Sequence, residues 1–139
     1  MTKDEELANY MALIEQYKEQ MSSLETQSSY LQAAVSDYTK AKMTIEQLSK
    51  TSKGDELLFP IGGSTFIKAT ASDSSKVLFD IGAGVVTEKN PKDAITNIDK
   101  RIEDLQKTQE RLLEIMQNLQ NEAAGISQKA QNLISEQKK

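Results

Sequence analysis

Two stripes of apolar residues, one near each end of the chain, advance by alternating steps of three and four residues. Of the twelve positions in each stripe, ten are apolar or aromatic in the first and eleven are apolar in the second, counting alanine. This spacing, sustained over about five heptads, predicts a left-handed coiled coil. The first stripe comprises Leu7, Tyr10, Ile14, Tyr17, Met21, Leu24, Ser28, Leu31, Val35, Tyr38, Lys42 and Ile45, and the second Ile95, Ile98, Ile102, Leu105, Gln109, Leu112, Met116, Leu119, Ala123, Ile126, Ala130 and Leu133.

Both predicted helices carry boundary signals. Thr2 and Glu5 have the spacing of a capping box, and Gly54 suits a C-terminal stop. Asn90 can cap the second helix, with Pro91 at its first position. The predicted division is an N-terminal coiled-coil helix over 1–53, a middle segment over 54–89 and a C-terminal coiled-coil helix over 90–139.

The two stripes are equally long, so an antiparallel hairpin pairs positions whose numbers add up to about 140. Leu7 then falls opposite Leu133, and the polar Ser28 and Gln109 come within one helical layer of each other. Two interpretations of that polar pair are equally open. It fixes the register as a buried contact, or each residue is a tolerated defect in contact with solvent.

The middle segment changes to β-branched and aromatic residues separated by turn residues, which predicts two β hairpins. The first turn is Gly62-Gly63-Ser64 and the second is Gly82-Ala83-Gly84. Pro60 lies within the first strand and predicts an edge or irregular strand. The fold class is therefore α+β, a long antiparallel coiled-coil hairpin with two central hairpins. The expected strands are Leu57–Ile61, Thr65–Ala71, Lys76–Ile81 and Val85–Glu88.

Hairpins of this size are marginal alone in water and leave strand edges open. The simplest remedy is pairing with hairpins of other subunits, so the middle segment is predicted to be an oligomerisation platform that completes a β barrel between subunits. The alternative is a small sheet packed only on its own coiled coil. The residues expected at the subunit contacts are Leu58, Pro60, Ile61, Phe66, Ile67, Val77, Leu78, Phe79, Ile81, Val85 and Val86.

Composition narrows the function classes. The chain has no cysteine and no histidine, so thiolate chemistry and the usual proton-transfer side chain are missing. Neither an enzyme nor a metal or other cofactor is expected. A net charge of −4, with both signs interspersed, disfavours nucleic-acid binding. The N-terminal residues are polar and no apolar run could span a bilayer, so we expect no membrane contact and a cytoplasmic location.

The middle segment carries the most specific resemblance. The resemblance rests on three segments: Leu57-Leu58-Phe59-Pro60-Ile61-Gly62-Gly63, Thr65-Phe66-Ile67-Lys68-Ala69, and Val77-Leu78-Phe79-Asp80-Ile81-Gly82-Ala83-Gly84-Val85-Val86 followed by Glu88. With the flanking helices they resemble the archaeal alpha-type subunits of the prefoldin family, over the whole chain. Two hairpins point to the alpha type, because the beta type has one.

The resemblance implies an ATP-independent chaperone, a holdase. It implies a hexamer of two alpha and four beta subunits, with an alpha–alpha contact, built on a platform of β barrels. It also implies that unfolded client proteins are held at the free tips of the coiled coils and passed to a group II chaperonin.

In the hairpin register the free tip is built from both termini. We call the two stripes together the seam. Seam residues at the tip are expected mainly to pack against the other helix, whereas Met11, Leu13 and Ile134 flank the seam and favour client contact. Similar flanking residues at Met43, Leu48, Leu113 and Ile115 are interpreted as helix contacts or packing at the joint with the platform. The candidate client-binding residues are Leu7, Tyr10, Met11, Leu13, Ile14, Ile126, Leu133 and Ile134.

Two other functions are compatible with the same pattern. One is a coiled-coil tether or assembly cofactor that shares the architecture and has no holdase activity. The other is an alpha-like chain that forms rings or filaments by itself.

Overall fold

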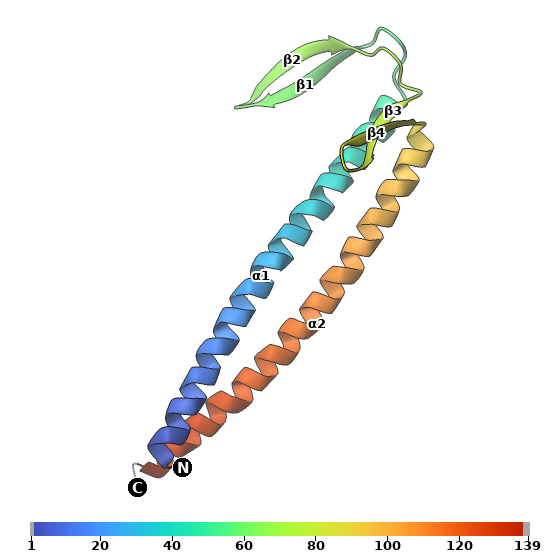
Figure 1. The fold of residues 1–139 in the computed structure, drawn as a ribbon. Helices are drawn as coiled ribbons and strands as arrows, with labels where there is room; N and C mark the ends of the chain where they lie inside the picture. The colour runs from blue at the N-terminus through green and yellow to red at the C-terminus, as the bar shows by residue number, and fades with distance from the viewer. Residues whose placement is uncertain (1, 138–139) are drawn as a thin grey trace. The chain divides into compact units, whose positions relative to one another are not determined.

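The computed structural model describes residues 2–137 and contains two helices and four strands (Figure 1). Helix α1 spans Lys3–Leu48 and helix α2 spans Pro91–Gln137. Between them lie β1 (Glu56–Gly62), β2 (Thr65–Thr70), β3 (Val77–Gly82) and β4 (Val85–Lys89). Two long helices and two hairpins confirm the predicted fold class.

The start of each helix is capped as its sequence predicts. The backbone N–H of Glu5 donates to Thr2 Oγ1 at 3.2 Å, and the N–H of Thr2 donates to Glu5 Oε2 at 3.4 Å. The N–H of Asp93 donates to Asn90 Oδ1 at 2.8 Å, with Pro91 as the first helical residue. These bonds satisfy N–H groups that have no partner within the helix.

The chain forms two compact units, one made of residues 2–34 and 105–137 and the other of residues 35–104. In the first, which we call the distal unit, the N-terminal part of α1 pairs with the C-terminal part of α2. Lys3 Nζ lies 3.5 Å from Glu136 Oε2, so both chain ends lie at the same end of this unit. The Nε2 of Gln109 donates to Ser28 Oγ at 2.7 Å. Both pairs agree with the predicted antiparallel register.

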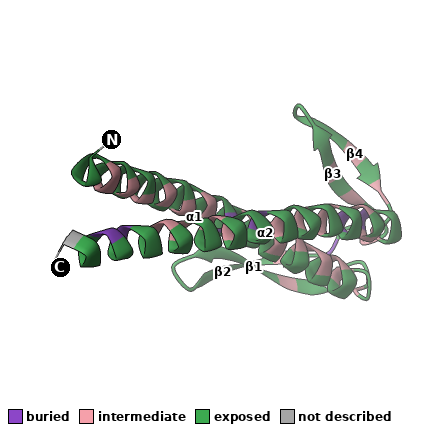
Figure 2. Cartoon of the chain, turned by 90° about the horizontal axis from the view of Figure 1, so that it is seen from below, coloured by how far each residue is buried: buried purple, intermediate pink, exposed green. Residues whose placement is uncertain are grey.

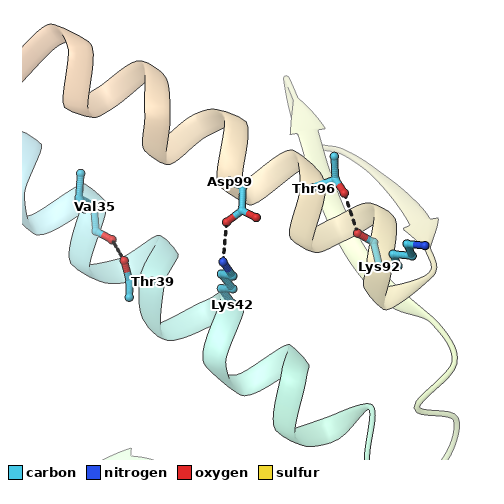
Figure 3. Close-up of polar contacts among 6 residues, drawn as sticks. All are labelled: Val35, Thr39, Lys42, Lys92, Thr96 and Asp99. Atoms are coloured by element: carbon cyan, nitrogen blue, oxygen red, sulfur yellow. Dashed lines mark hydrogen bonds and ion pairs between the residues drawn. The ribbon is translucent and has the colours of Figure 1, made fainter.

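The second unit, the platform unit, holds the rest of both helices and all four strands. Its helices are joined by an ion pair of 2.9 Å between Lys42 Nζ and Asp99 Oδ1 (Figure 3). Asp99 holds the pKa of the Lys42 ammonium above its usual range, first by the hydrogen bond and then by charge. A lysine at a seam position is therefore matched by an acid from the facing helix.

The predicted seam is confirmed in both units. Every position of the two stripes is half-buried or buried, whereas most other helical residues are exposed (Figure 2). Among the described residues, the buried positions within the stripes are Ser28, Ile98, Leu112, Ala130 and Leu133. The low burial of most seam residues is expected for two helices, which cover each other only along one side.

The strands form two separate antiparallel pairs, β1 with β2 and β3 with β4. In both hairpins the register shifts just before a glycine, Gly62 or Gly82. The two turn residues that follow have positive φ in each case, Gly63 and Ser64 in the first hairpin and Ala83 and Gly84 in the second. That is the type I′ pattern, whose twist matches the twist of paired strands. The described chain contains no closed barrel, so a barrel would need strands from other chains.

Candidate interaction surfaces

The strands carry a concentration of exposed apolar side chains, and Figure 2 shows most strand residues as exposed. A two-stranded hairpin cannot bury both its faces, and exposed apolar clusters of this kind mark contact sites. The exposed large apolar residues of the strands are Leu58, Phe59, Ile61, Phe66, Ile67, Leu78, Ile81, Val85 and Val86.

The sequence-based set of contact residues shares eight residues with this surface and also contains Pro60, which is exposed but is not a large side chain. It differs further at three positions. Phe59 was missing from the sequence-based set, although it is 49% exposed and pairs with Ile67 across the hairpin. The alternation of residues along β1 could have found it, since Phe59 lies between Leu57 and Ile61 on one face. Val77 and Phe79 were in the set, but both are half-buried within the chain itself.

The candidate client-binding residues divide into two groups. Leu7, Tyr10, Ile14 and Ile126 are half-buried in the seam, and Leu133 is only 7% exposed. Met11, Leu13 and Ile134 are exposed, Ile134 at 38%. In the described geometry, therefore, the three flanking residues are the exposed apolar side chains of the candidate set at the end of the distal unit. The half-buried seam residues are partly accessible, and Leu133 would become accessible only if the helix ends separated.

The interpretation of the other flanking residues was wrong at three of four positions. Met43, Leu113 and Ile115 are exposed rather than packed, and Leu48 is half-buried. A 3-4 pattern identifies the residues that face the other helix but cannot show how far a neighbouring side chain is covered.

A groove of about 550 Å³ runs between the two helices of the distal unit. Its apolar lining includes Ile14, Met21, Leu113, Met116 and Ala123. The small side chains of α2 leave this space open, because alanine and serine cannot fill the gap between two helices. The remaining lining residues are Tyr17, Lys18, Glu25, Gln117, Leu119, Gln120, Ala124 and Ser127.

The groove lies on one side of the seam. Leu113 follows the seam residue Leu112 by one position, and the lining residues outside the seam all follow a seam residue in this way. Met11 and Ile134 also follow seam residues by one, so they lie on the same side as the groove. Leu13 and Ile115 precede seam residues and lie on the other side.

At the edge of this groove, Tyr17 and Glu122 meet across the helices. Burial, followed by the charge and hydrogen bonding of Glu122, raises the pKa of the Tyr17 hydroxyl. The described residues hold no cluster of three acidic, histidine or cysteine side chains able to bind a metal ion. Within the same residues, neither helix has a stretch apolar enough to cross a membrane.

Comparison with known proteins gives consistent matches. The family model "Prefoldin subunit" matches residues 17–136. The prefoldin subunit alpha of Methanococcoides burtonii is 31% identical over 111 residues, which cover 80% of this chain and 80% of that protein. The prefoldin subunit alpha of Methanococcus maripaludis is 34% identical over 107 residues, covering 77% and 72%.

One solved structure, filamentous PFD from Methanocaldococcus jannaschii, has a TM-score of 0.58 with this chain at 21% identity. The likeness covers 90% of this chain and 98% of the other. At that identity the likeness concerns the fold.

Proposed function

This chain belongs to the prefoldin family, and from that premise we propose that it is a subunit of an ATP-independent holdase that binds unfolded proteins at the ends of its coiled-coil helices. The family is one of chaperones and not of enzymes. The proposed complex contains two copies of this chain and four beta-type subunits, acts in the cytoplasm and passes its clients to a group II chaperonin.

The assembly half of the proposal is supported by the strands. Nine large apolar residues are exposed on two hairpins that are too small to be stable by themselves. Beta-type subunits, and the second copy of this chain, would cover them through the platform. The residues proposed for these contacts are the sequence-based set without the half-buried Val77 and Phe79, and with Phe59 added.

The observation that carries the holdase half is the exposure of Met11, Leu13 and Ile134 at the end where both chain termini lie. None of the three is needed to close the seam. Methionine and aliphatic side chains adapt to many apolar partners without requiring a fixed geometry. A surface of this kind suits weak, distributed contact with non-native chains of varied sequence.

The test is suppression of aggregation by the complex assembled with an archaeal prefoldin beta subunit. Changing Met11, Leu13 and Ile134 together to serine should lower suppression severalfold while the native mass of the complex stays the same. The matched control changes three exposed residues away from the tip, Tyr30, Met43 and Ile115, to serine. Equal suppression by the two triple variants would contradict the proposed client site.

The tether and the self-assembling chain are distinguished by two measurements. If the chain is a tether, the complex of the unmodified chain would assemble normally but would not suppress aggregation. A self-assembling chain would give a large native mass without any beta subunit, an outcome made relevant by the filamentous relative.

A further inference from the structure

Arg101 of α2 contacts two other elements of the platform unit, α1 and β3. One terminal nitrogen, Nη1, donates to the hydroxyl oxygen of Tyr38 on α1 at 3.2 Å. The other, Nη2, donates to the backbone carbonyl oxygen of Asp80 on β3, also at 3.2 Å. The guanidinium carbon lies 4.6 Å from the centre of the Phe79 ring and 5.6 Å from that of Tyr38. One side chain thus connects both helices to the second hairpin.

These contacts need an arginine. The planar guanidinium can donate in two directions while its face lies over an aromatic ring, and a lysine ammonium cannot reproduce that geometry. The Phe79 ring also has Lys89 Nζ at 5.3 Å, so two cations surround it. The chain has one other arginine, Arg111, which is exposed on the same helix.

The contacts decide which face of the second hairpin is covered. Val77 pairs with Lys89, and Phe79 with Thr87, on the face that meets Arg101, and all four residues are half-buried. Leu78 pairs with Glu88, and Asp80 with Val86, on the opposite face, and all four are exposed. The covered and open faces therefore alternate residue by residue along β3 and β4.

The first hairpin provides an internal comparison. Phe59 stands three positions before the bulge glycine Gly62, as Phe79 stands three before Gly82. Phe59 and its partner Ile67 are nevertheless exposed, and so is Leu58 on the other face. The same phenylalanine in the same hairpin geometry is half-buried only where Arg101 lies against it.

We infer that Arg101 is a positioning residue for assembly: it holds the β3–β4 hairpin by one face on the coiled coil, so that the Leu78 and Val86 face is presented to an apolar sheet face of another subunit. The identity of that subunit rests on the proposed function. The orientation of the β3–β4 hairpin within this chain does not depend on the proposed function. The β1–β2 hairpin, in which only the Leu57–Ala69 pair is half-buried, is left to adjust to its partner.

Millisecond hydrogen exchange on the full chain tests the inference without a partner. Arg101→Lys should raise exchange of the β3–β4 amides about tenfold, because it removes a stacked cation and a charge-assisted hydrogen bond. Exchange in β1–β2 should stay the same. Arg111→Lys, the matched control, should change neither hairpin. Unchanged β3–β4 exchange in Arg101→Lys would overturn the inference.

A second pair of variants separates positioning from general stability. Phe79→Leu should raise β3–β4 exchange like Arg101→Lys, and the double variant should add little, because both changes break one contact. Fully additive effects would contradict the inference. Leu78→Ser should weaken the complex with a beta subunit about tenfold without altering exchange in the free chain. If the unmodified complex shows no holdase activity, the proposed function fails while the exchange results still decide the role of Arg101.

Discussion

The side-chain amide of Gln109 donates a hydrogen bond of 2.7 Å to the hydroxyl of Ser28 in the middle of an otherwise apolar seam. Ser28 is only 8% exposed and Gln109 is half-buried, so the contact between them lies within the seam. The Oε1 of Gln109 is buried and accepts no hydrogen bond from the described residues. Of the two interpretations open from the sequence, the structure supports the buried polar contact, which can specify register at a cost in stability.

Removing Ser28 alone should lower the free energy of unfolding, whereas removing both polar residues should not. Ser28→Ala alone should lower the free energy of unfolding by about 1–2 kcal/mol, because it leaves the Gln109 amide buried without an acceptor. Ser28→Ala with Gln109→Leu should equal or exceed the original stability, since no polar group then remains to be desolvated. Urea unfolding followed by circular dichroism measures both. A double variant less stable than Ser28→Ala would rule out this account.

Leu133 and Ile134 are neighbours in sequence with different roles at the tip. Leu133→Ala should lower the free energy of unfolding of the distal unit by about 2 kcal/mol, because a buried seam side chain is lost close to a helix end. Ile134→Ala should stay within about 0.5 kcal/mol, because that side chain is exposed. Hydrogen exchange of helical amides in residues 105–137 measures both. Equal costs would mean that the described seam is wrong at this end.

Ala83 adopts a left-handed backbone conformation with φ of 53° in the turn of the second hairpin. A Cβ atom in this region costs about 1 kcal/mol, so Ala83→Gly should stabilise the hairpin by up to that amount. The readout is slower exchange of the β3–β4 amides. Ala69→Gly, in an extended strand, is the control and should speed exchange of β1–β2, because glycine there only adds freedom to the unfolded chain. Faster β3–β4 exchange in Ala83→Gly would contradict the described turn.

The Lys42–Asp99 pair predicts a specific pH dependence. The pKa of Lys42 is raised in the folded chain, so its contribution to stability is complete below the unfolded lysine value and is lost as the pH rises through the folded value. Relative to Lys42→Met, the original chain should therefore lose stability above the ordinary lysine pKa of about 10.4. Urea midpoints over this range measure it, with Lys100→Met, at an exposed position of α2, as control. A constant difference between Lys42→Met and the original chain would contradict the shift.

The sequence was sufficient for the features that depend on periodicity. Apolar side chains are excluded from water wherever the helices allow it, so the 3-4 stripes identified all twenty-four seam positions and their register. Turn residues with few backbone alternatives, Gly62-Gly63-Ser64 and Gly82-Ala83-Gly84, likewise fixed both hairpins.

The features that were missed depend on distances between elements. Arg101 lies one residue before the seam position Ile102, and nothing local indicates that its guanidinium reaches the Phe79 ring. The groove beside Met21 depends on how closely two helices approach where Ala123 and Ala124 replace larger residues. Neither follows from a repeat of apolar positions, because a repeat shows which residues face the other helix but not how far apart the elements lie.

The matching bulges and turns of the two hairpins have a consequence for the history of the chain. Leu58, Phe59, Ile61 and Gly62 recur in the same order as Leu78, Phe79, Ile81 and Gly82, with the register shift at the same step. This is the pattern expected from duplication of one ancestral hairpin. The Phe79 copy of this pattern lies against Arg101, whereas the Phe59 copy has no such cation against its ring among the described contacts, so one repeated hairpin has two different surroundings within the same chain.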